Sequence, residues 1–188
     1  MEFRQFDIEG PFEVIPTKRG DNRGYFSEIL RMEPFIAHAG PVEFVQDNQS
    51  LSVSPGTIRG IHFQTQPRGQ GKLVRCTAGS VFDVAVDLRN DSDTYGKWIS
   101  VVLTAEKLNQ IWIPVGFGHA FCTLEPRSVI TYRVTDYYSP EHDEGVAWDD
   151  SDIGIHWPDV ADPDTLSTRD RVLPALSDLP PLFSVKSR

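Results

Sequence analysis

An alternation of period two between apolar and polar residues constrains the fold of this 188-residue chain more than any other feature. Successive side chains of a β-strand point to opposite faces, so a strand whose two faces have different surroundings shows this period. In residues 81–88, VFDVAVDL, one face consists of Phe82, Val84, Val86 and Leu88. The other face consists of Val81, Asp83, Ala85 and Asp87. The segment is therefore predicted to be a strand with two unlike faces.

Short runs rich in β-branched and aromatic residues recur along the chain, separated by turn sequences such as SPG, AGS and RNDSDTYG. The runs are VEFVQ, TIRGIHFQ, KLVRCT, WISVVL, QIWIPV and VITYRV. Their spacing predicts an all-β, antiparallel sandwich or barrel. Helical patterns are confined to EPFIAHAG at 33–40 and to the segment after DPDTLSTRD.

The length favours one domain over residues 1–188. From about residue 160 the composition shifts to Asp, Pro and Ser, which predicts a C-terminal extension (about 160–188) packed over the barrel rather than a second domain. The chain contains no run of the roughly 20 apolar residues that span a bilayer. Its N-terminal segment, MEFRQFDIEG, lacks the apolar core of a secretory signal.

Charge and cysteine content limit the partners and the compartment. A net charge of -9 argues against nucleic acid as a partner, although an anionic small ligand is allowed where basic residues converge. Cys76 and Cys122 lie in strand-like runs and are expected to be reduced core thiols. We therefore expect a cytoplasmic protein that binds neither nucleic acid nor a membrane.

One histidine, His62, stands in an apolar run and raises the question of a metal site. Pro114, Gly116 and His119 form a P-x-G-x-x-H arrangement similar to the second motif of the cupin superfamily of jelly-roll barrels. The first cupin motif would supply His-x-His and a later glutamate, whereas here Gln64 follows His62 and no well-placed glutamate is seen. Two histidines are too few for a firmly held Zn or Fe ion, so no metal is expected.

Without a metal, His62 is either a packed core histidine or an acid–base group. Gly60, His62 and Gln64 are expected to share one strand face, and Lys72 shares a face with Val74 and Cys76. An imidazole and an ammonium would then project into one cavity. Burying both without a ligand would be costly, which favours a functional role.

Eight segments, in this order, resemble the signatures of the dTDP-4-dehydrorhamnose 3,5-epimerase family and together cover nearly the whole chain. They are DNRGYFSE (21–28), VQDNQS (45–50), IRGIHFQ (58–64), GKLVRC (71–76), VFDVAVDLRNDSDTYGKW (81–98), IPVGFGHAF (113–121), TYRVTDYYSPEHDEGVAWDD (131–150) and LSTRD (166–170). The chain departs from the family pattern at Ile61, Phe63 and Ala120, and these changes are small. The resemblance implies a cupin-type jelly roll and an epimerase of a dTDP-4-keto-6-deoxyhexose in dTDP-L-rhamnose biosynthesis.

The resemblance also implies four catalytic residues. His62 matches the family's base, Asp170 the carboxylate paired with it, Tyr132 the acid on the opposite face of the sugar, and Lys72 the residue that steadies the enolate oxygen. Without the resemblance, Asp170 and Lys72 would be taken for solvated charges and Tyr132 for a core residue with its hydroxyl at the rim. The roles agree with the chemistry, because a 4-keto group acidifies the hydrogens at C3 and C5 and no cofactor is needed.

The other implied residues bind the nucleotide sugar. Arg59 and Arg23 match diphosphate ligands. His119 matches a position that lines the sugar pocket or has a structural role. The positions expected around the thymidine are Phe26, Glu28, Gln46, Asn48 and Tyr138. The family implies a homodimer in which each subunit lends residues 23–28 to its partner. Arg59 and His62 are three positions apart, so a regular strand would point their side chains to opposite faces. A bend near Gly60 is therefore required for both to reach the ligand.

Three alternatives stay open at this point. The first is a relative that epimerises only C3 or only C5, since such an enzyme needs the same acid and base. The second is a non-catalytic cupin that binds a nucleotide sugar, which the presence of all four catalytic matches disfavours. The third is a metal-dependent cupin enzyme, which Gln64 disfavours.

Overall fold

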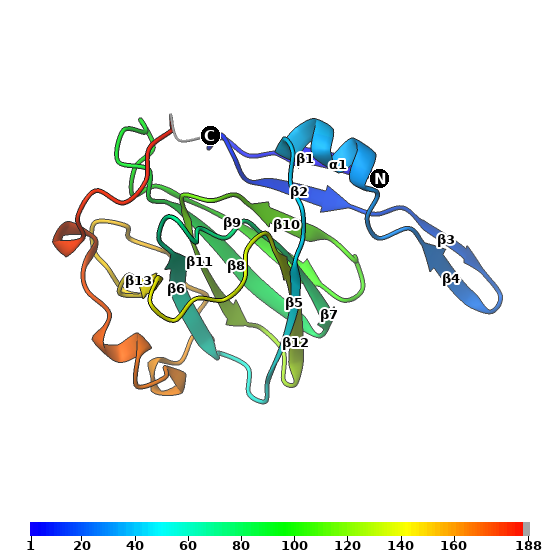
Figure 1. Cartoon of the computed structure of the whole chain (residues 1–188). Helices are drawn as coiled ribbons and strands as arrows, with labels where there is room; N and C mark the ends of the chain where they lie inside the picture. Colours follow the sequence, from blue (N-terminus) through cyan, green and yellow to red (C-terminus); the bar gives the residue numbers. More distant parts are fainter. Residues whose placement is uncertain (186–188) are drawn as a thin grey trace.

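The computed structural model describes residues 1–185, and two antiparallel sheets face each other in it as a jelly roll (Figure 1). The six-stranded sheet has the order β1 (Glu2–Gln5), β2 (Phe12–Ile15), β10 (Gln110–Ile113), β7 (Lys72–Ala78), β12 (Ser128–Val134), β5 (Gln46–Ser52). The five-stranded sheet has the order β13 (Asp143–Gly145), β6 (Ile58–Gln64), β11 (Phe117–Thr123), β8 (Ser80–Asp87), β9 (Trp98–Thr104). The predicted all-β, antiparallel jelly-roll class is confirmed.

The strand alternation produces three apolar layers. Val81 and Ala85 of β8 point between the sheets and pack there with side chains of the six-stranded sheet such as Val74. Val84 and Val86 point outward and are covered by the C-terminal segment. The third layer lies on the outer face of the six-stranded sheet, under the helix α1 (Met32–Ala39). Both faces of the central strands are therefore buried, which explains why their runs are so apolar.

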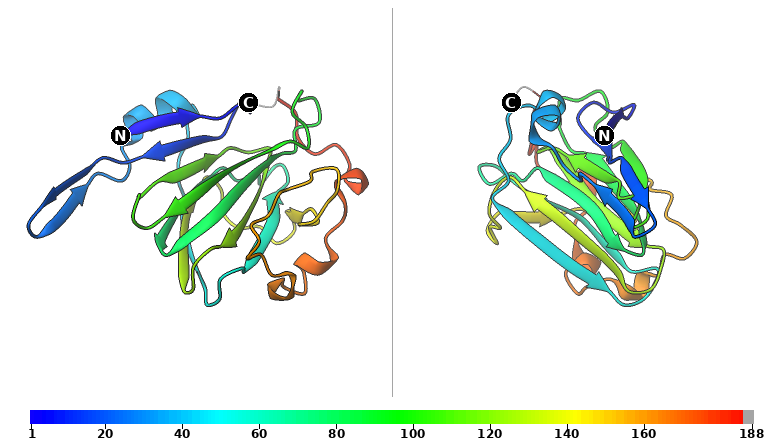
Figure 2. Two further views of the ribbon diagram at one scale, coloured as in Figure 1. Left: turned by 180° about the vertical axis from the view of Figure 1, so that it is seen from behind. Right: turned by 90° about the vertical axis from the view of Figure 1, so that its right-hand side faces the viewer.

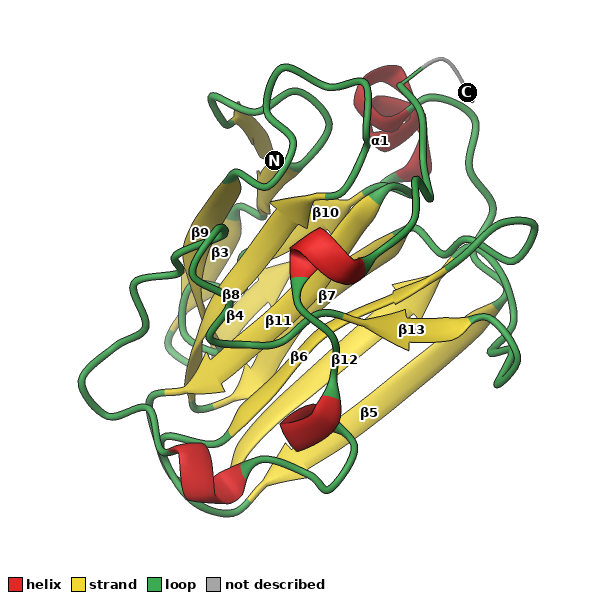
Figure 3. Ribbon diagram, turned by 90° about the vertical axis from the view of Figure 1, so that its left-hand side faces the viewer, coloured by secondary structure: helices red, strands yellow, loops and turns green. Residues whose placement is uncertain are grey.

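The C-terminal segment crosses the outer face of the five-stranded sheet (Figures 2 and 3). It contains three 3-10 turns, η1 (Pro163–Thr165), η2 (Asp170–Val172) and η3 (Leu176–Asp178). The segment after DPDTLSTRD, predicted to be helical, forms only single 3-10 turns, because prolines at 174, 180 and 181 prevent a longer helix. No helix among residues 1–185 is long and apolar enough to cross a bilayer.

Most predicted strands are confirmed, and one is not. The runs at 57–64, 72–77, 98–103 and 129–134 coincide within one residue with β6, β7, β9 and β12. VEFVQ at 42–46 is not a strand, since β5 begins only at Gln46, opposite Val134 of β12. Val42 and Phe44 are apolar because they pack against the layer beneath α1. The helix predicted at 33–40 is confirmed within one residue at each end.

A β-bulge in β6 decides which of its side chains face the barrel interior. His119 of β11 pairs with His62 and Phe121 pairs with Arg59, so β6 has one residue more than β11 over this interval. Because His119 and Phe121 share a face, Arg59 and His62 do as well. The bend required near Gly60 is therefore confirmed, whereas Gly60 lies within the bulge and does not simply share the face of His62.

A two-stranded hairpin, β3 (Lys18–Asp21) and β4 (Gly24–Ser27), belongs to neither sheet. It projects from the barrel, beyond the end of α1 (Figures 1 and 2). Its aromatic side chains are exposed, with Phe26 at 71% of its full accessible surface. A hairpin of this kind is marginally stable alone, so it is expected to pack against another surface.

The bulge predicts a large cost for Gly60→Ala. Gly60 has φ +120, and a Cβ there would lie 2.5 Å from the Cβ of Ala120 and 2.6 Å from the carbonyl oxygen of His119. Unfavourable φ and overpacking each cost about 1–3 kcal/mol. Gly24→Ala is the control, because Gly24 has φ +132 but open space around it. Urea unfolding should show the larger loss for Gly60→Ala; equal losses would mean that close packing at the bulge is unimportant.

Candidate active site

A histidine and a carboxylate from distant parts of the chain meet at the mouth of the barrel. Nε2 of His62 lies 2.7 Å from Oδ1 of Asp170, and the Asp170 side chain is only 4% exposed. Asp170 comes from η2 of the C-terminal segment, and its main-chain N–H donates to Oγ of Ser167. The structure thus brings together the two residues expected to form the base and its partner.

The state of the Asp170 carboxyl determines which imidazole nitrogen is free. Burial alone would raise the pKa of Asp170, but the hydrogen bonds from His62 and Ser167 outweigh it, and the pKa is lowered. The carboxylate is therefore ionised at neutral pH and accepts a hydrogen bond, so Nε2 of neutral His62 carries the hydrogen and donates it. Nδ1 is left with a free lone pair and is the nitrogen able to accept a further proton.

Lys72 is not the exposed charge that its sequence context alone suggested. It is buried at the start of β7 and its Nζ donates to the main-chain oxygen of His62 at 3.3 Å. Burial lowers the pKa of Lys72 to about 8, against the opposing effect of the carboxylates of Asp143 and Asp83. At pH 7 the side chain is still mostly an ammonium, held where little water screens it. It can oppose a negative charge that develops on a nearby oxygen.

Tyr132 lies on β12, in the sheet opposite to His62, and packs at the edge of the interior core. Burial raises the pKa of its phenol, with Arg59 opposing the shift, so the hydroxyl remains protonated at neutral pH. Arg59 is held near β5 by a hydrogen bond from its Nε to Oγ of Ser52, 3.3 Å long. The interior is therefore flanked by an imidazole on one sheet and a phenol on the other.

His119 lies beside His62 on the neighbouring strand and is buried. Its Nε2 is 3.0 Å from a carboxylate oxygen of Asp83, which is fully buried on β8. Burial raises the pKa of Asp83, an effect that His119 and Lys72 oppose. His119 is thus held by a carboxylate of its own, next to the ammonium of Lys72.

Gln64 occupies the position of the second histidine of the cupin motif and has a different function. Its amide donates to the main-chain oxygens of Arg68 and Tyr137, and its Oε1 accepts from the N–H of Ser139. Gln64 therefore joins two loops at the mouth of the barrel. Among residues 1–185 no three His, Cys, Asp or Glu side chains are grouped to hold a metal ion.

Three of the residues expected around the thymidine lie together. The Nε2 of Gln46 donates to Oδ1 of Asn48 at 2.8 Å, and its Oε1 accepts from the main-chain N–H of Tyr138. Asn48 is the register partner of Tyr132, so this group adjoins the phenol. The ring of Tyr138 is exposed and is free to stack against a planar group.

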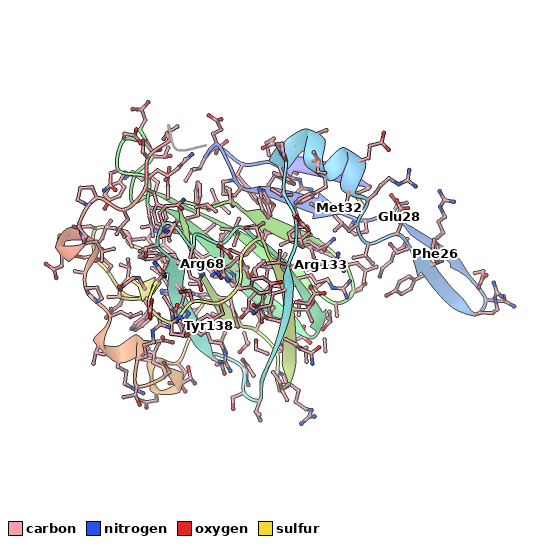
Figure 4. The ribbon with its side chains drawn as sticks, in the orientation of Figure 1. Phe26, Glu28, Met32, Arg68, Arg133 and Tyr138 are labelled. Carbon is pink, nitrogen blue, oxygen red and sulfur yellow. The ribbon has the colours of Figure 1, made fainter. Side chains whose placement is uncertain are left out.

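The other three expected nucleotide residues lie far from this group. Arg23, Phe26 and Glu28 belong to the projecting hairpin and the segment directly after it. Figure 4 shows Phe26 and Glu28 on the opposite side of the molecule from Tyr138. Arg23 is ion-paired with Asp21, and Glu28 with Arg31. One chain therefore does not bring all the expected binding residues together.

Sequence reasoning missed three charged residues around the site. Asp83 holds His119, and Asp143 and Arg169 form an ion pair of 2.6 Å next to Asp170. Asp83 stands between Val81 and Ala85 on one strand face, which was a usable signal for a buried partner. Asp143 and Arg169 lie in polar loops, where no pattern separates them from solvated charges.

A hollow of about 550 Å³ lies on the outer face of the six-stranded sheet. Asn48 and Tyr132 contribute to its lining, together with Ile29, Leu30, Asp47, Gln49, Leu73, Arg75, Gln110, Thr131 and Arg133. His62, Lys72 and Asp170 are not part of the lining. Leu73 of the lining belongs to the layer under α1, whereas Val74 and Tyr132 pack in the barrel interior. The hollow therefore lies across the six-stranded sheet from the reactive groups.

The chain is similar in sequence and in fold to known sugar-nucleotide epimerases. Residues 5–178 match the family model described as dTDP-4-dehydrorhamnose 3,5-epimerase. The dTDP-4-dehydrorhamnose 3,5-epimerase of Sinorhizobium fredii is 50% identical over 183 residues, which are 97% of this chain and 93% of that protein.

Two solved structures show the same likeness. The Bacillus anthracis dTDP-4-dehydrorhamnose 3,5-epimerase, with TDP and PPi bound, is 41% identical and superposes with a TM-score of 0.88 over 93% of this chain and 98% of that one. The Legionella pneumophila dTDP-6-deoxy-D-glucose-3,5-epimerase, in complex with dTDP-4-keto-L-rhamnose, is 36% identical with a TM-score of 0.91 over 99% of both chains.

The burial of Lys72 predicts an unusual titration. In a ¹³C-lysine spectrum, the signal that disappears in Lys72→Met should titrate with a midpoint near pH 8, because desolvation disfavours the ammonium. Asp143→Asn should move the midpoint to lower pH, since that carboxylate raises the pKa of Lys72. Asp149→Asn, at an exposed position, is the control. A midpoint at the ordinary value of about 10.4 would contradict the burial of the ammonium.

Proposed function

The chain belongs to the dTDP-4-dehydrorhamnose 3,5-epimerase family, and we propose that it converts dTDP-4-dehydro-6-deoxy-D-glucose to dTDP-4-dehydro-L-rhamnose. The enzyme is an isomerase that inverts the sugar at C3 and C5. The 4-keto group acidifies the hydrogens on both carbons, so each inversion needs only removal of a proton from one face and its return to the other. The observation that carries the proposal is that His62 and Tyr132 project from opposite sheets.

In this mechanism His62 is the base. Nδ1 accepts the proton from the sugar carbon, and the carboxylate of Asp170 stabilises the imidazolium that results. The imidazole has only to be neutral before the step, and the hydrogen bond at Nε2 keeps it in the required tautomer. The same arrangement serves C3 and C5 in turn, provided that the sugar is seated in two related positions.

Lys72 and Tyr132 complete the reaction. The ammonium of Lys72 stabilises the negative charge that develops on the C4 oxygen when the carbon loses its proton. The phenol of Tyr132 then donates a proton from the opposite face. Its raised pKa keeps it protonated between turnovers. The chemistry needs no redox cofactor, because the substrate is neither oxidised nor reduced overall.

Binding of the anionic nucleotide depends on local basic groups rather than on the net charge of -9. The guanidinium of Arg59 is on the same face of β6 as His62 and is a suitable fork for diphosphate oxygens. Tyr138, Gln46 and Asn48 are placed to contact the thymidine. We assign His119 to the wall of the sugar pocket, where Asp83 orients it.

We further propose a homodimer in which residues 23–28 complete the partner's site. The aromatic side chains of the hairpin, Tyr25 and Phe26, are exposed in the described chain, and a second copy would supply a surface that covers them. Arg23, Phe26 and Glu28 would then join the nucleotide residues. The free thiols of Cys76 and Cys122 are consistent with a cytoplasmic enzyme, which we also propose.

The test of the function is to incubate the protein with dTDP-4-dehydro-6-deoxy-D-glucose in deuterium oxide. The native enzyme should exchange hydrogen for deuterium at C3 and C5 and should accumulate the 3,5-epimer. His62→Asn should abolish exchange at both carbons, a fall of about 10²-fold or more. Tyr132→Phe should exchange at C3 with retained configuration faster than epimer appears, because the base still acts while the donor is missing.

Mass spectrometry and NMR of the same sample compare deuterium content with epimer yield. Exchange at a single carbon in the native enzyme would identify a 3- or 5-epimerase, and no exchange would identify a binding protein. Tight coupling of exchange and epimerisation in Tyr132→Phe would show that Tyr132 is not the acid. Turnover should survive exhaustive chelation; loss restored by added Zn or Fe would contradict the proposed metal-free mechanism.

A composite site predicts complementation between two defective chains. In a purified heterodimer of Arg23→Ala and His62→Asn chains, one of the two sites would have both residues intact. Its activity should be about half that of the native dimer, well above either variant homodimer. The control is a heterodimer of Asp7→Ala and His62→Asn chains, which is prepared in the same way and shows the effect of the preparation itself. No gain over the single variants would show that each chain builds its site alone.

A further inference from the structure

We propose that Arg169 and Asp143 are positioning residues, whose ion pair holds η2 against β13 and thereby keeps Asp170 in contact with His62. The inference rests on the proposed function only in taking His62 as the base. It goes beyond that function because it assigns a catalytic effect to a contact between two residues of this chain, independent of whether either touches the substrate.

Arg169 makes three hydrogen bonds to one short strand. Its Nη1 donates to Oδ2 of Asp143 at 2.6 Å, and its Nη2 donates to the main-chain oxygens of Asp143 and Glu144 at 3.1 and 3.3 Å. The planar guanidinium suits this arrangement, because its donors are fixed in one fork. β13 in turn pairs with β6, where Gly145 is the partner of His62. The strand that receives Arg169 is therefore the neighbour of the strand that carries the base.

The turn η2 has few other attachments on its N-terminal side. Its internal bonds, such as that from the N–H of Val172 to the oxygen of Arg169, only close the turn. Val172 is 77% exposed and does not anchor it. After the turn, the oxygen of Pro174 accepts from the N–H of Ala147. Thr165 contacts the barrel before the turn, and Pro174 contacts it after the turn. In the stretch between these two residues, the polar side-chain links to the barrel come from Arg169 and Asp170.

The same carboxylate also contacts the expected nucleotide site. Oδ2 of Asp143 accepts from the hydroxyl of Tyr138 at 3.0 Å as well as from Arg169. Tyr138 is tied through its main-chain N–H to Gln46. Contacts therefore connect Tyr138, whose ring is expected to stack on thymine, through Asp143 to Arg169. Asp170 is the next residue in the chain after Arg169.

The effect of the pair should appear in the reaction and not in stability. Arg169 is partly exposed, and ion pairs at such positions contribute little to the free energy of unfolding. A small displacement of a catalytic group, however, can reduce the rate by up to about 10²-fold. Arg169 also helps to keep the pKa of Asp170 low, behind the larger effect of His62. Loosening the turn would thus weaken both the position and the charge of the partner of His62.

The experiment compares Arg169→Gln with Arg171→Gln. Arg171 lies in the same turn and is exposed, but its guanidinium donates to the oxygen of Asp164, away from β13. Arg169→Gln should lower kcat at saturating substrate by about 10-fold, on the scale expected for a misplaced group, with a thermal midpoint like that of the native enzyme. Arg171→Gln should leave kcat unchanged. Arg169→Lys, which keeps the charge but not the fork, should recover part of the loss.

A direct readout is the NMR signal of the proton between Nε2 of His62 and Asp170. In the native protein it should be strongly downfield and slow to exchange, whereas in Arg169→Gln it should broaden or move upfield; Arg171→Gln should not change it. Asp143→Asn should weaken the signal similarly, and the double variant should lose no more than the worse single variant, since both remove one interaction.

Two results would overturn the inference. One is a raised KM with unchanged kcat and an unchanged His62 signal in Arg169→Gln, which would limit Arg169 to substrate contact. The other is an equal loss in Arg171→Gln, which would indicate a general disturbance of the turn. Failure of the proposed function is separate: the native enzyme would then show no epimerisation, while the His62 signal would still report whether the ion pair positions Asp170.

Discussion

The hydrogen bond between His62 and Asp170 joins residues 108 positions apart, and much of the structure is needed to make it. The barrel supplies His62, the bulge in β6 turns it inward, and the C-terminal segment returns across the five-stranded sheet to deliver Asp170. Each of these elements is held by its own apolar layer. The site is thus a consequence of how the tail is packed, and not a loop added to a finished barrel.

Buried charges around this bond are tolerated because each has a partner. Asp83 contacts His119, Lys72 donates to the oxygen of His62, and the buried Arg89 forms an ion pair with Asp87. Among the described residues no buried side-chain nitrogen or oxygen lacks a hydrogen bond. Removing one partner from such a pair costs more than the pair contributes, since the remaining charge stays desolvated. These groups therefore also fix the arrangement of the interior.

The two-sheet architecture suits an inversion of configuration. A base and an acid that act on opposite faces of one carbon must be separated by the thickness of the sugar ring. In a jelly roll the two inner faces are about 10 Å apart, which is close to what side chains on both walls need to reach a ligand between them. Phe26 and Glu28, which are expected to contact the nucleotide, lie apart from the rest of the expected site because the hairpin points away from its own barrel (Figure 4).

The sequence by itself determined the strand-rich fold, because period two can be read from neighbouring residues, and it identified His62, Lys72, Tyr132 and Asp170 once the ordered segments were compared with a family. It also required a bend near Gly60, because the resemblance implies that both Arg59 and His62 reach the ligand and a regular strand would point them to opposite faces. The tertiary structure decided what local patterns cannot express. Val42 and Phe44 of VEFVQ pack under α1 outside any strand. Lys72 is buried rather than solvated, and Asp83, Asp143 and Arg169 are partners of site residues. Those contacts join residues far apart in the chain, and their energies depend on burial, which exists only after the sheets and the tail have closed around them.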